Sequence, residues 1–314
     1  MAEKIGEDGI DVLIGCSGHT GGNRLLCFAR KPAPVQASWL GYLGTTGMSA
    51  IDYYLADRHF LPASQFDSQF AEKLVYLPAA APFAPDERAP LVNPLPALRN
   101  GQVTFASFNR LSKLTPFAIT LWSRLLRAIP EARMMVGAMP PEGHYSRLME
   151  WFAREGIARE RLSFHARCDT AAYLALHHQV DICLDTAPYT GGATTNHALW
   201  MGVPTLSLAG VTPAGRLSAA LLRHVGLDSF VGEDEGEFVR KGVSWANDLG
   251  ALAEMRAGLR ARCGRSPTFQ PELIAAGMES AFRMMWQRWC LGLPPLAFEV
   301  DGHRIDDSLR RTQA

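Results

Sequence analysis

The residues best suited to chemistry lie in a glycine- and threonine-rich segment past the middle of the chain. An apolar run at residues 182–184 is followed by residues 188–196 (PYTGGATTN) and then by a helical pattern. Glycine allows close approach of the backbone to a ligand, and the free N–H groups at a helix start attract phosphate. The hydroxyls of Thr194 and Thr195 would add donors. The segment predicts an anion-binding loop, and an ordinary helix capped by Thr194 or Thr195 fits the same residues.

A second polar loop follows the apolar run at residues 103–108. It reads NRLSKLTP (residues 109–116) and carries the cations Arg110 and Lys113. Cations at this position could meet a diphosphate and offset charge that develops on a leaving group. Solvated surface cations are the alternative, and convergence with the loop of Thr194 and Thr195 would favour the functional interpretation.

Two glycine-rich turns follow apolar runs nearer the N-terminus. They are residues 18–24 (GHTGGNR) and 41–47 (GYLGTTG). Both could face a ligand, and both could simply reverse the chain. His19 could bind a polar substrate or take part in proton transfer, although an isolated histidine is more often structural.

The elements that must position these loops alternate between short apolar runs and amphipathic segments, the pattern of parallel βα units. Six prolines between residues 78 and 96 indicate a linker between two lobes. We expect a partial first lobe at 1–92 with its linker from 78, a second lobe at 93–291 and a polar tail at 292–314. Expected strands are 10–14, 35–40, 53–56, 74–77, 103–108, 133–136, 162–165, 182–184 and 205–208. Expected helices are 116–128, 142–155, 170–178, 195–201, 216–225, 235–248, 252–262 and 271–291.

Composition limits the possible partners. The chain has 314 residues, with 31 Lys and Arg against 31 Asp and Glu, which argues against a broad basic surface for duplex nucleic acid. Its six cysteines are scattered without zinc spacing, so we expect reduced thiols and no metal site. Neither a signal peptide nor an apolar run of membrane-spanning length is seen, which predicts a cytoplasmic protein without a membrane partner.

Three longer stretches resemble a known family. RKPAPVQASWLGYLGTTGMSAIDYYLAD, TFASFNRLSKLTP and VDICLDTAPYTGGATTNHALWMGVPTLSLAG are similar to the catalytic region of the O-linked N-acetylglucosamine transferase and SPINDLY family, glycosyltransferase family 41. The bacterial SPINDLY-like branch is the nearest match. The resemblance implies a GT-B fold of two Rossmann-like lobes with a cleft between them, with the first lobe truncated at its N-terminus. It also implies an N-terminal helical repeat region of the TPR kind, fused to this region.

The activity implied by the resemblance is an inverting, metal-independent transfer of a sugar to Ser or Thr of a protein. The donor would be UDP-N-acetylglucosamine, or GDP-fucose as in some SPINDLY members, and no further cofactor is implied. By position, Lys113 would be catalytic and contact the diphosphate. The donor would be held by Arg110, Cys168, Thr170, Tyr173, Thr194, Thr195 and His197, and the sugar or acceptor side would be formed by His19, Gly41, Gly44 and Thr45.

Three positions depart from the family pattern. Tyr173 stands where the family has a histidine, Leu176 where animal members have an arginine, and His197 where the family has an acidic residue for the ribose hydroxyls. A neutral histidine cannot replace the bidentate carboxylate acceptor. Two other functions therefore stay open: a catalytically weak nucleotide-binding protein, and a sugar-nucleotide epimerase of the same architecture.

Overall fold

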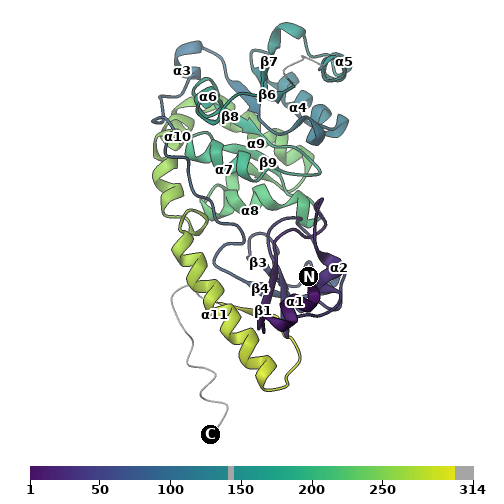
Figure 1. Ribbon diagram of the computed structural model, residues 1–314. Helices are drawn as coiled ribbons and strands as arrows, with labels where there is room; N and C mark the ends of the chain where they lie inside the picture. Colours follow the sequence, from purple (N-terminus) through teal and green to yellow (C-terminus); the bar gives the residue numbers. More distant parts are fainter. Residues whose placement is uncertain (141–144, 301–314) are drawn as a thin grey trace. The chain divides into compact units, whose positions relative to one another are not determined.

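The computed structural model describes residues 1–140 and 145–300, and the chain forms two compact units. Residues 83–266 form the second unit, and the first unit combines residues 1–82 with the segment from residue 267 onward. In Figure 1 the first unit carries the purple and yellow ends of the colour scale, and the second unit carries the blue to green range.

The second unit is built on a six-stranded, fully parallel sheet with the order β10-β9-β8-β5-β6-β7. The strands are β5 (Thr104–Ser107), β6 (Arg133–Met139), β7 (Leu162–Ala166), β8 (Ile182–Leu184), β9 (Thr205–Leu208) and β10 (Val231–Gly232). Because the chain winds outward in both directions from β5 and β8, the strand order reverses between these two neighbours. Ligands of such sheets bind beyond the carboxyl ends of the strands at that reversal.

Eight helices of the described residues accompany this sheet (Figure 1). They are α3 (Ala97–Asn100), α4 (Pro116–Ala128), α5 (Ser146–Arg154), α6 (Thr170–Leu176), α7 (Ala193–Trp200), α8 (Leu217–His224), α9 (Glu235–Asn247) and α10 (Leu249–Gly264). Several of these helices begin at a capping side chain. At α4, the Thr115 hydroxyl accepts the Ala118 N–H at 3.1 Å before a proline at the first helical position. The Asp234 and Asp248 carboxylates cap α9 and α10 in the same way.

A buried arginine attaches the proline-rich segment to the second unit. Arg256 of α10 is only 1% exposed. Its guanidinium donates to the backbone carbonyl of Asn93 at 2.8 Å, to the Val180 carbonyl at 2.7 Å and to the His177 carbonyl at 3.1 Å, and it also binds the Asn93 side chain at 2.5 Å. Burial lowers the pKa of Arg256 to about 10, so it stays charged at neutral pH. The two bonds to Asn93 hold this part of the proline-rich segment against α10.

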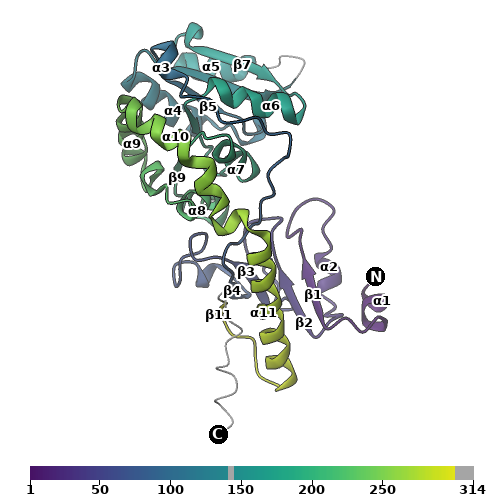
Figure 2. The ribbon, with the colours of Figure 1, turned by 90° about the vertical axis from the view of Figure 1, so that its left-hand side faces the viewer.

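The first unit is a five-stranded parallel sheet with the order β1-β2-β3-β4-β11. Its elements are α1 (Ala2–Glu7), β1 (Val12–Gly15), α2 (Leu25–Phe28), β2 (Val35–Ser38), β3 (Tyr53–Ala56), β4 (Lys73–Tyr76), α11 (Pro271–Cys290) and β11 (Phe298–Glu299). The long helix α11 lies along the sheet (Figure 2). Its Ala281 and Met285 are buried in one cluster with Val35, Leu55 and Val75 of the strands.

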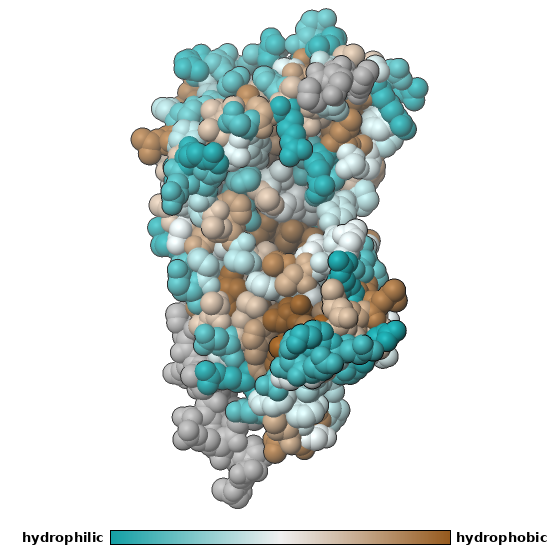
Figure 3. All heavy atoms as spheres, in the orientation of Figure 1, coloured by the Kyte–Doolittle hydropathy of each residue, from teal (hydrophilic) through white to brown (hydrophobic). Residues whose placement is uncertain are grey.

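The surface is mixed in character, as the neutral composition suggests. Figure 3 shows hydrophilic residues over much of the face in view, with apolar residues between them. Within the described residues, no helix combines the length and apolar character needed to cross a membrane.

Two expectations about organisation need correction. The sequence predicts that the helix of residues 271–291 belongs to the second lobe, but it packs with the first unit. There Gly277 lies so close to Pro78 that a Cβ at residue 277 would be 2.8 Å from the proline Cδ. We expected residues 292–314 to be a polar tail, yet β11 pairs with β4 and Val300 is buried. A two-residue strand has no periodicity to detect, so only its pairing reveals it. Residues 142–144 of the expected helix 142–155 and residues 301–314 of the tail lie outside the described residues.

Candidate functional site

Lys113 ends a short 3-10 turn, η2 (Leu111–Lys113), directly after β5. Its ammonium donates to the backbone carbonyl of Thr190 at 2.6 Å and lies 4.3 Å from the ring centroid of Tyr189. Burial lowers the pKa of Lys113 from its usual value, and the charge of Arg110 adds to this, while the carboxylate of Asp185 acts in the opposite direction. A cation from the β5 loop is thereby fixed against the loop that follows β8.

The loop after β8 ends at a helix start without a side-chain cap. Helix α7 has Gly192 as its N-cap residue, and within residues 1–140 and 145–300 no side chain caps its first turn. This corrects the alternative in which Thr194 or Thr195 caps the helix. Thr195 instead shares a 2.8 Å hydrogen bond with the hydroxyl of Ser218. The first N–H groups of α7 are thus left for an anion.

Gly191 packs closely against both threonines. A Cβ at this position would lie 2.6 Å from Oγ1 of Thr195 and 2.8 Å from Oγ1 of Thr194, far inside normal contact. The residue at 191 must therefore lack a side chain if the two hydroxyls are to keep their places.

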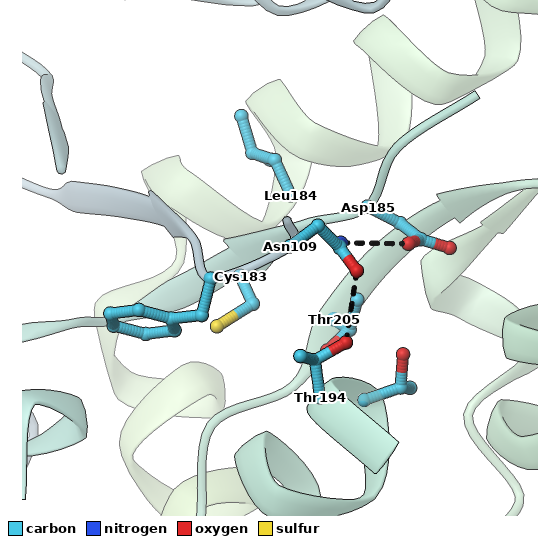
Figure 4. Close-up of a pocket in the computed structure, with 8 residues that line it drawn as sticks. Asn109, Cys183, Leu184, Asp185, Thr194 and Thr205 are labelled. Atoms are coloured by element: carbon cyan, nitrogen blue, oxygen red, sulfur yellow. Dashed lines mark hydrogen bonds between the residues drawn. The ribbon is translucent and has the colours of Figure 1, made fainter. Parts of the chain in front are cut away.

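Asp185 and Asn109 are functional candidates that the sequence interpretation missed. Asp185 follows β8 and is 3% exposed. Asn109 follows β5, donates to Oδ1 of Asp185 at 3.4 Å and accepts a 3.0 Å hydrogen bond from the hydroxyl of Thr194 (Figure 4). The available signal was a carboxylate that ends an apolar run, directly before the glycine-rich loop.

Behind this network lies a cavity of only about 10 Å³, lined in part by Phe108, Cys183 and Thr205 (Figure 4). The buried hydroxyl of Thr205 has no hydrogen-bond partner within the described structure. This volume suits one water molecule and no larger group.

Aromatic rings surround His197, on the next turn of α7. His197 makes edge contacts with Tyr173 of α6 at 5.4 Å and with Phe83 at 5.2 Å between centroids. Burial lowers the pKa of His197, so its ring is neutral at pH 7. The Tyr173 hydroxyl is buried and lacks a hydrogen-bond partner among the residues described, and burial raises its pKa. Leu176 ends α6.

The remaining donor-side candidates lie further out. Arg110 is exposed beside the turn of Lys113. Cys168 is exposed and Thr170 opens α6, beyond the carboxyl end of β7, which is two strands from β5 in the sheet. In the part of the chain that the structure describes, no group of three His, Cys, Asp or Glu side chains could hold a metal ion.

The first unit brings its own candidates together at the carboxyl ends of β1 and β2. The Nε2 atom of His19 lies 3.2 Å from the carbonyl oxygen of Thr45. A carbonyl can only accept, so Nε2 is the donor in this bond. The His19 ring also meets the edge of Tyr42 at 5.4 Å. Gly41 has a φ of +58°, and a Cβ there would lie 2.6 Å from the carbonyl oxygen of Cys16.

A buried carboxylate fixes the turn that contains Gly44 and Thr45. Glu72 is 4% exposed, and it accepts hydrogen bonds from the Thr45 hydroxyl and the Thr46 N–H, both at 2.7 Å. It also binds the Thr46 hydroxyl. The first-unit candidates thus share one ordered pair of turns.

Comparison with known proteins defines the family. The sequence model of glycosyl transferase family 41 matches residues 1–92 and 95–278. The chain belongs to glycosyl transferase family 41. This family 41 chain is 36% identical over 322 residues to a probable UDP-N-acetylglucosamine–peptide N-acetylglucosaminyltransferase SPINDLY of Hordeum vulgare, covering 99% of the chain and 34% of the relative. With the Arabidopsis thaliana protein of the same name, identity is 37% over 305 residues, with 94% and 33% covered.

Solved structures agree with the sequence relatives. A mutant of the Thermobaculum terrenum O-GlcNAc transferase superposes with a TM-score of 0.84 at 37% identity, covering 93% of this family 41 chain and 56% of that chain. The pneumococcal O-GlcNAc transferase GtfA, in complex with UDP and GlcNAc, has a TM-score of 0.54 at 13% identity, with 90% and 59% covered, which shows the fold alone. The expected family and α/β GT-B architecture are confirmed. The family 41 chain spans about one third of the length of the curated relatives it matches.

Proposed function

We propose that this chain is the catalytic region of a protein O-glycosyltransferase that transfers N-acetylglucosamine from UDP-N-acetylglucosamine to Ser or Thr hydroxyls. The observation that carries the proposal is the Lys113 ammonium fixed beside the uncapped start of α7, where the strand order reverses. Fixed cationic and N–H groups at such a point suit a diphosphate. The names of the sequence relatives support the sugar and the peptide acceptor.

The chemistry follows from the charge that moves during transfer. The acceptor hydroxyl attacks the anomeric carbon on the face opposite the diphosphate, so the new bond forms with inversion as the old bond to the diphosphate oxygen breaks. The electron pair leaves with the nucleoside diphosphate. Lys113 and the N–H groups at the start of α7 stabilise that negative charge, which makes a metal-independent reaction feasible. The hydroxyl proton passes to a base or to solvent.

The roles of the remaining candidates are part of the same proposal. Arg110, Cys168 and Thr170 would border the nucleotide, with Tyr173 and His197 beside its base and ribose. His19, Gly41, Gly44 and Thr45 would serve the sugar or the acceptor. A GDP-fucose donor is the alternative that the SPINDLY resemblance implies. Neutral His197 offers the ribose of either nucleotide a weaker acceptor than a carboxylate.

The setting of the protein is also proposed. The protein would be cytoplasmic, its acceptor would be a protein, and the catalytic region would be fused to a TPR-like repeat region in the longer protein. The bacterial branch remains a prediction, and so does the absence of nucleic-acid and membrane partners.

Nucleotide binding and donor turnover test the proposal. We expect UDP, and to a smaller extent GDP, to raise the melting temperature of the chain, and we expect Lys113→Ala to abolish this shift. The exposed Lys73 of the first unit provides the control variant Lys73→Ala, which should keep the shift. Release of UDP from the donor, sensitive to Lys113→Ala, would support the transferase. Binding without turnover would favour a weak nucleotide-binding protein, and conversion of the free donor without acceptor would favour an epimerase.

A further inference from the structure

The carboxylate of Asp185 is the centre of a buried hydrogen-bond network, and Figure 4 shows its bond to Asn109. Its Oδ1 accepts the N–H groups of Gly191 at 2.7 Å and Thr186 at 2.8 Å and the amide of Asn109 at 3.4 Å. Its Oδ2 accepts the hydroxyl of Ser207 of β9 at 2.7 Å. These donors come from the β5 loop, the β8 loop and β9. A single side chain therefore holds together three segments at the point where the strand order reverses.

Two of these bonds lead directly to the groups that would meet an anion. Asn109 uses its amide oxygen to accept the hydroxyl of Thr194 in the first turn of α7. Gly191, whose N–H is bound to Asp185, follows Thr190, whose carbonyl holds the ammonium of Lys113. Removing the Asp185 carboxylate would therefore weaken the contacts that position Thr194 and Lys113 at the same time.

A second buried carboxylate on the same strand gives a direct comparison. Asp181 precedes β8 and is fully buried, and it accepts the N–H groups of Ala97 at 2.9 Å and Thr104 at 2.8 Å. It lies at the amino end of the strand, whereas Asp185 lies at the carboxyl end. Burial raises the pKa of both carboxyl groups, so both cost desolvation energy that their hydrogen bonds must offset. The two carboxylates bind different segments. Asp181 accepts N–H groups at the starts of α3 and β5, whereas Asp185 binds the loops that follow β5 and β8.

We propose that Asp185 is a positioning residue for the diphosphate site, which acts through Asn109 and Gly191 and makes no contact with the substrate itself. This inference rests on the proposed function. In its terms, Asp185 aligns the start of α7 with the Lys113 loop so that both face the same leaving group. Misplacement by about 1 Å can cost about 100-fold in rate, so the network is expected to matter for turnover as well as for folding.

The test compares Asp185→Asn with Asp181→Asn in the whole chain. Both variants should lower the melting temperature, because each removes a buried acceptor. UDP titrations are made below the melting temperatures of both variants. The dissociation constant for UDP should be at least about tenfold higher for Asp185→Asn and should equal the wild-type value for Asp181→Asn. The swapped double variant Asp185→Asn with Asn109→Asp restores one carboxylate and one amide to the network, and it should recover part of the affinity.

Wild-type UDP affinity and donor turnover in folded Asp185→Asn would overturn the inference, and so would equal losses in Asp181→Asn. If Asp185→Asn does not fold, Asn109→Ala replaces it, since that variant cuts the connection to Thr194 without removing a charge. Wild-type affinity in Asn109→Ala would likewise overturn the inference. A wild-type chain that binds neither UDP nor GDP would overturn the proposed function and this inference with it, an outcome distinct from the failure of Asp185 alone.

Discussion

The hydroxyl of Thr194 donates a 3.0 Å hydrogen bond to the amide oxygen of Asn109, a residue 85 positions earlier in the chain. This bond joins the start of α7 to the loop that carries Lys113. The two loops thus form one surface, which combines the Lys113 cation with a helix start that no side chain caps among the described residues. That combination is what a leaving diphosphate requires.

Replacing Lys113 with methionine should strongly reduce turnover and leave the fold intact. Methionine keeps the length of the side chain but removes a partly buried charge, so the melting temperature should stay the same or rise. Loss of one preorganised group for the leaving diphosphate should reduce donor turnover by about 100- to 1,000-fold. UDP release assays and thermal melts check both parts. Turnover within a few-fold of wild type would contradict the assigned role.

As the pH is raised, nucleotide affinity should begin to fall at a lower pH than it would if Lys113 had the pKa of an exposed lysine. Burial lowers the pKa of Lys113, so its ammonium loses its proton, and the site its cation, at a lower pH than usual. Loss of that buried charge does not itself destabilise the fold, because the neutral form is the one that burial favours. UDP titrations between pH 7 and 10 should show this decline, and Lys113→Met should lack it. Parallel profiles in the two proteins would exclude Lys113 as its source.

Gly191→Ala should disable the anion loop. The new methyl group would overlap the hydroxyls of Thr194 and Thr195, so one or both must move. We expect about a tenfold or larger loss of UDP affinity. The matched control is Gly258→Ala in α10, where a Cβ meets nothing within 4 Å and alanine should stabilise the helix by about 0.5–1 kcal/mol. Calorimetric titration with UDP measures the affinity of both variants. Equal UDP affinities would argue against the close packing of Gly191 on the two threonine hydroxyls.

Arg256→Met should destabilise the second unit strongly. It removes one buried cation and leaves the carbonyls of Asn93, Val180 and His177 without this donor. The expected loss in unfolding free energy is about 3–5 kcal/mol, measured by urea denaturation. Arg240→Met, at an exposed position on α9, should change it by less than about 0.5 kcal/mol. A small effect at Arg256 would mean that the proline-rich segment is held mainly by other contacts.

Acid should destabilise the chain through His177. This side chain is fully buried, its Nδ1 donates to the carbonyls of Tyr173 and Leu174, and burial lowers its pKa to about 3. The unfolded chain binds a proton near pH 6.5 and the folded chain does not, so stability is present above pH 6.5 and is lost as pH falls toward 3. The loss should reach roughly 3 kcal/mol near pH 4. Denaturation at several pH values should show a smaller slope for His177→Gln, and an unchanged slope would assign the effect to other groups.

The sequence by itself determined the parallel α/β architecture, the family and the two loops that carry Lys113 and Thr194. Apolar periodicity, proline and glycine positions and capping residues report the local backbone, so nearly all expected strands and helices agree with the structure within a few residues. Tyr173 and His197 were likewise singled out from their positions in the motifs.

Only the tertiary structure decided which distant groups meet. It joined Asn109 to Asp185 and Thr194, it set Gly191 against both threonine hydroxyls, and it assigned α11 and β11 to the first unit. A sequence pattern can indicate that a residue is buried. It does not indicate which distant segment will supply the hydrogen-bond partner of a buried polar group, because the fold brings that segment beside it. Asp185 finds two donors, Thr186 and Gly191, in its own loop. A further partner, Asn109, lies 76 positions away, so the chain between them must fold before the carboxylate can join the two loops.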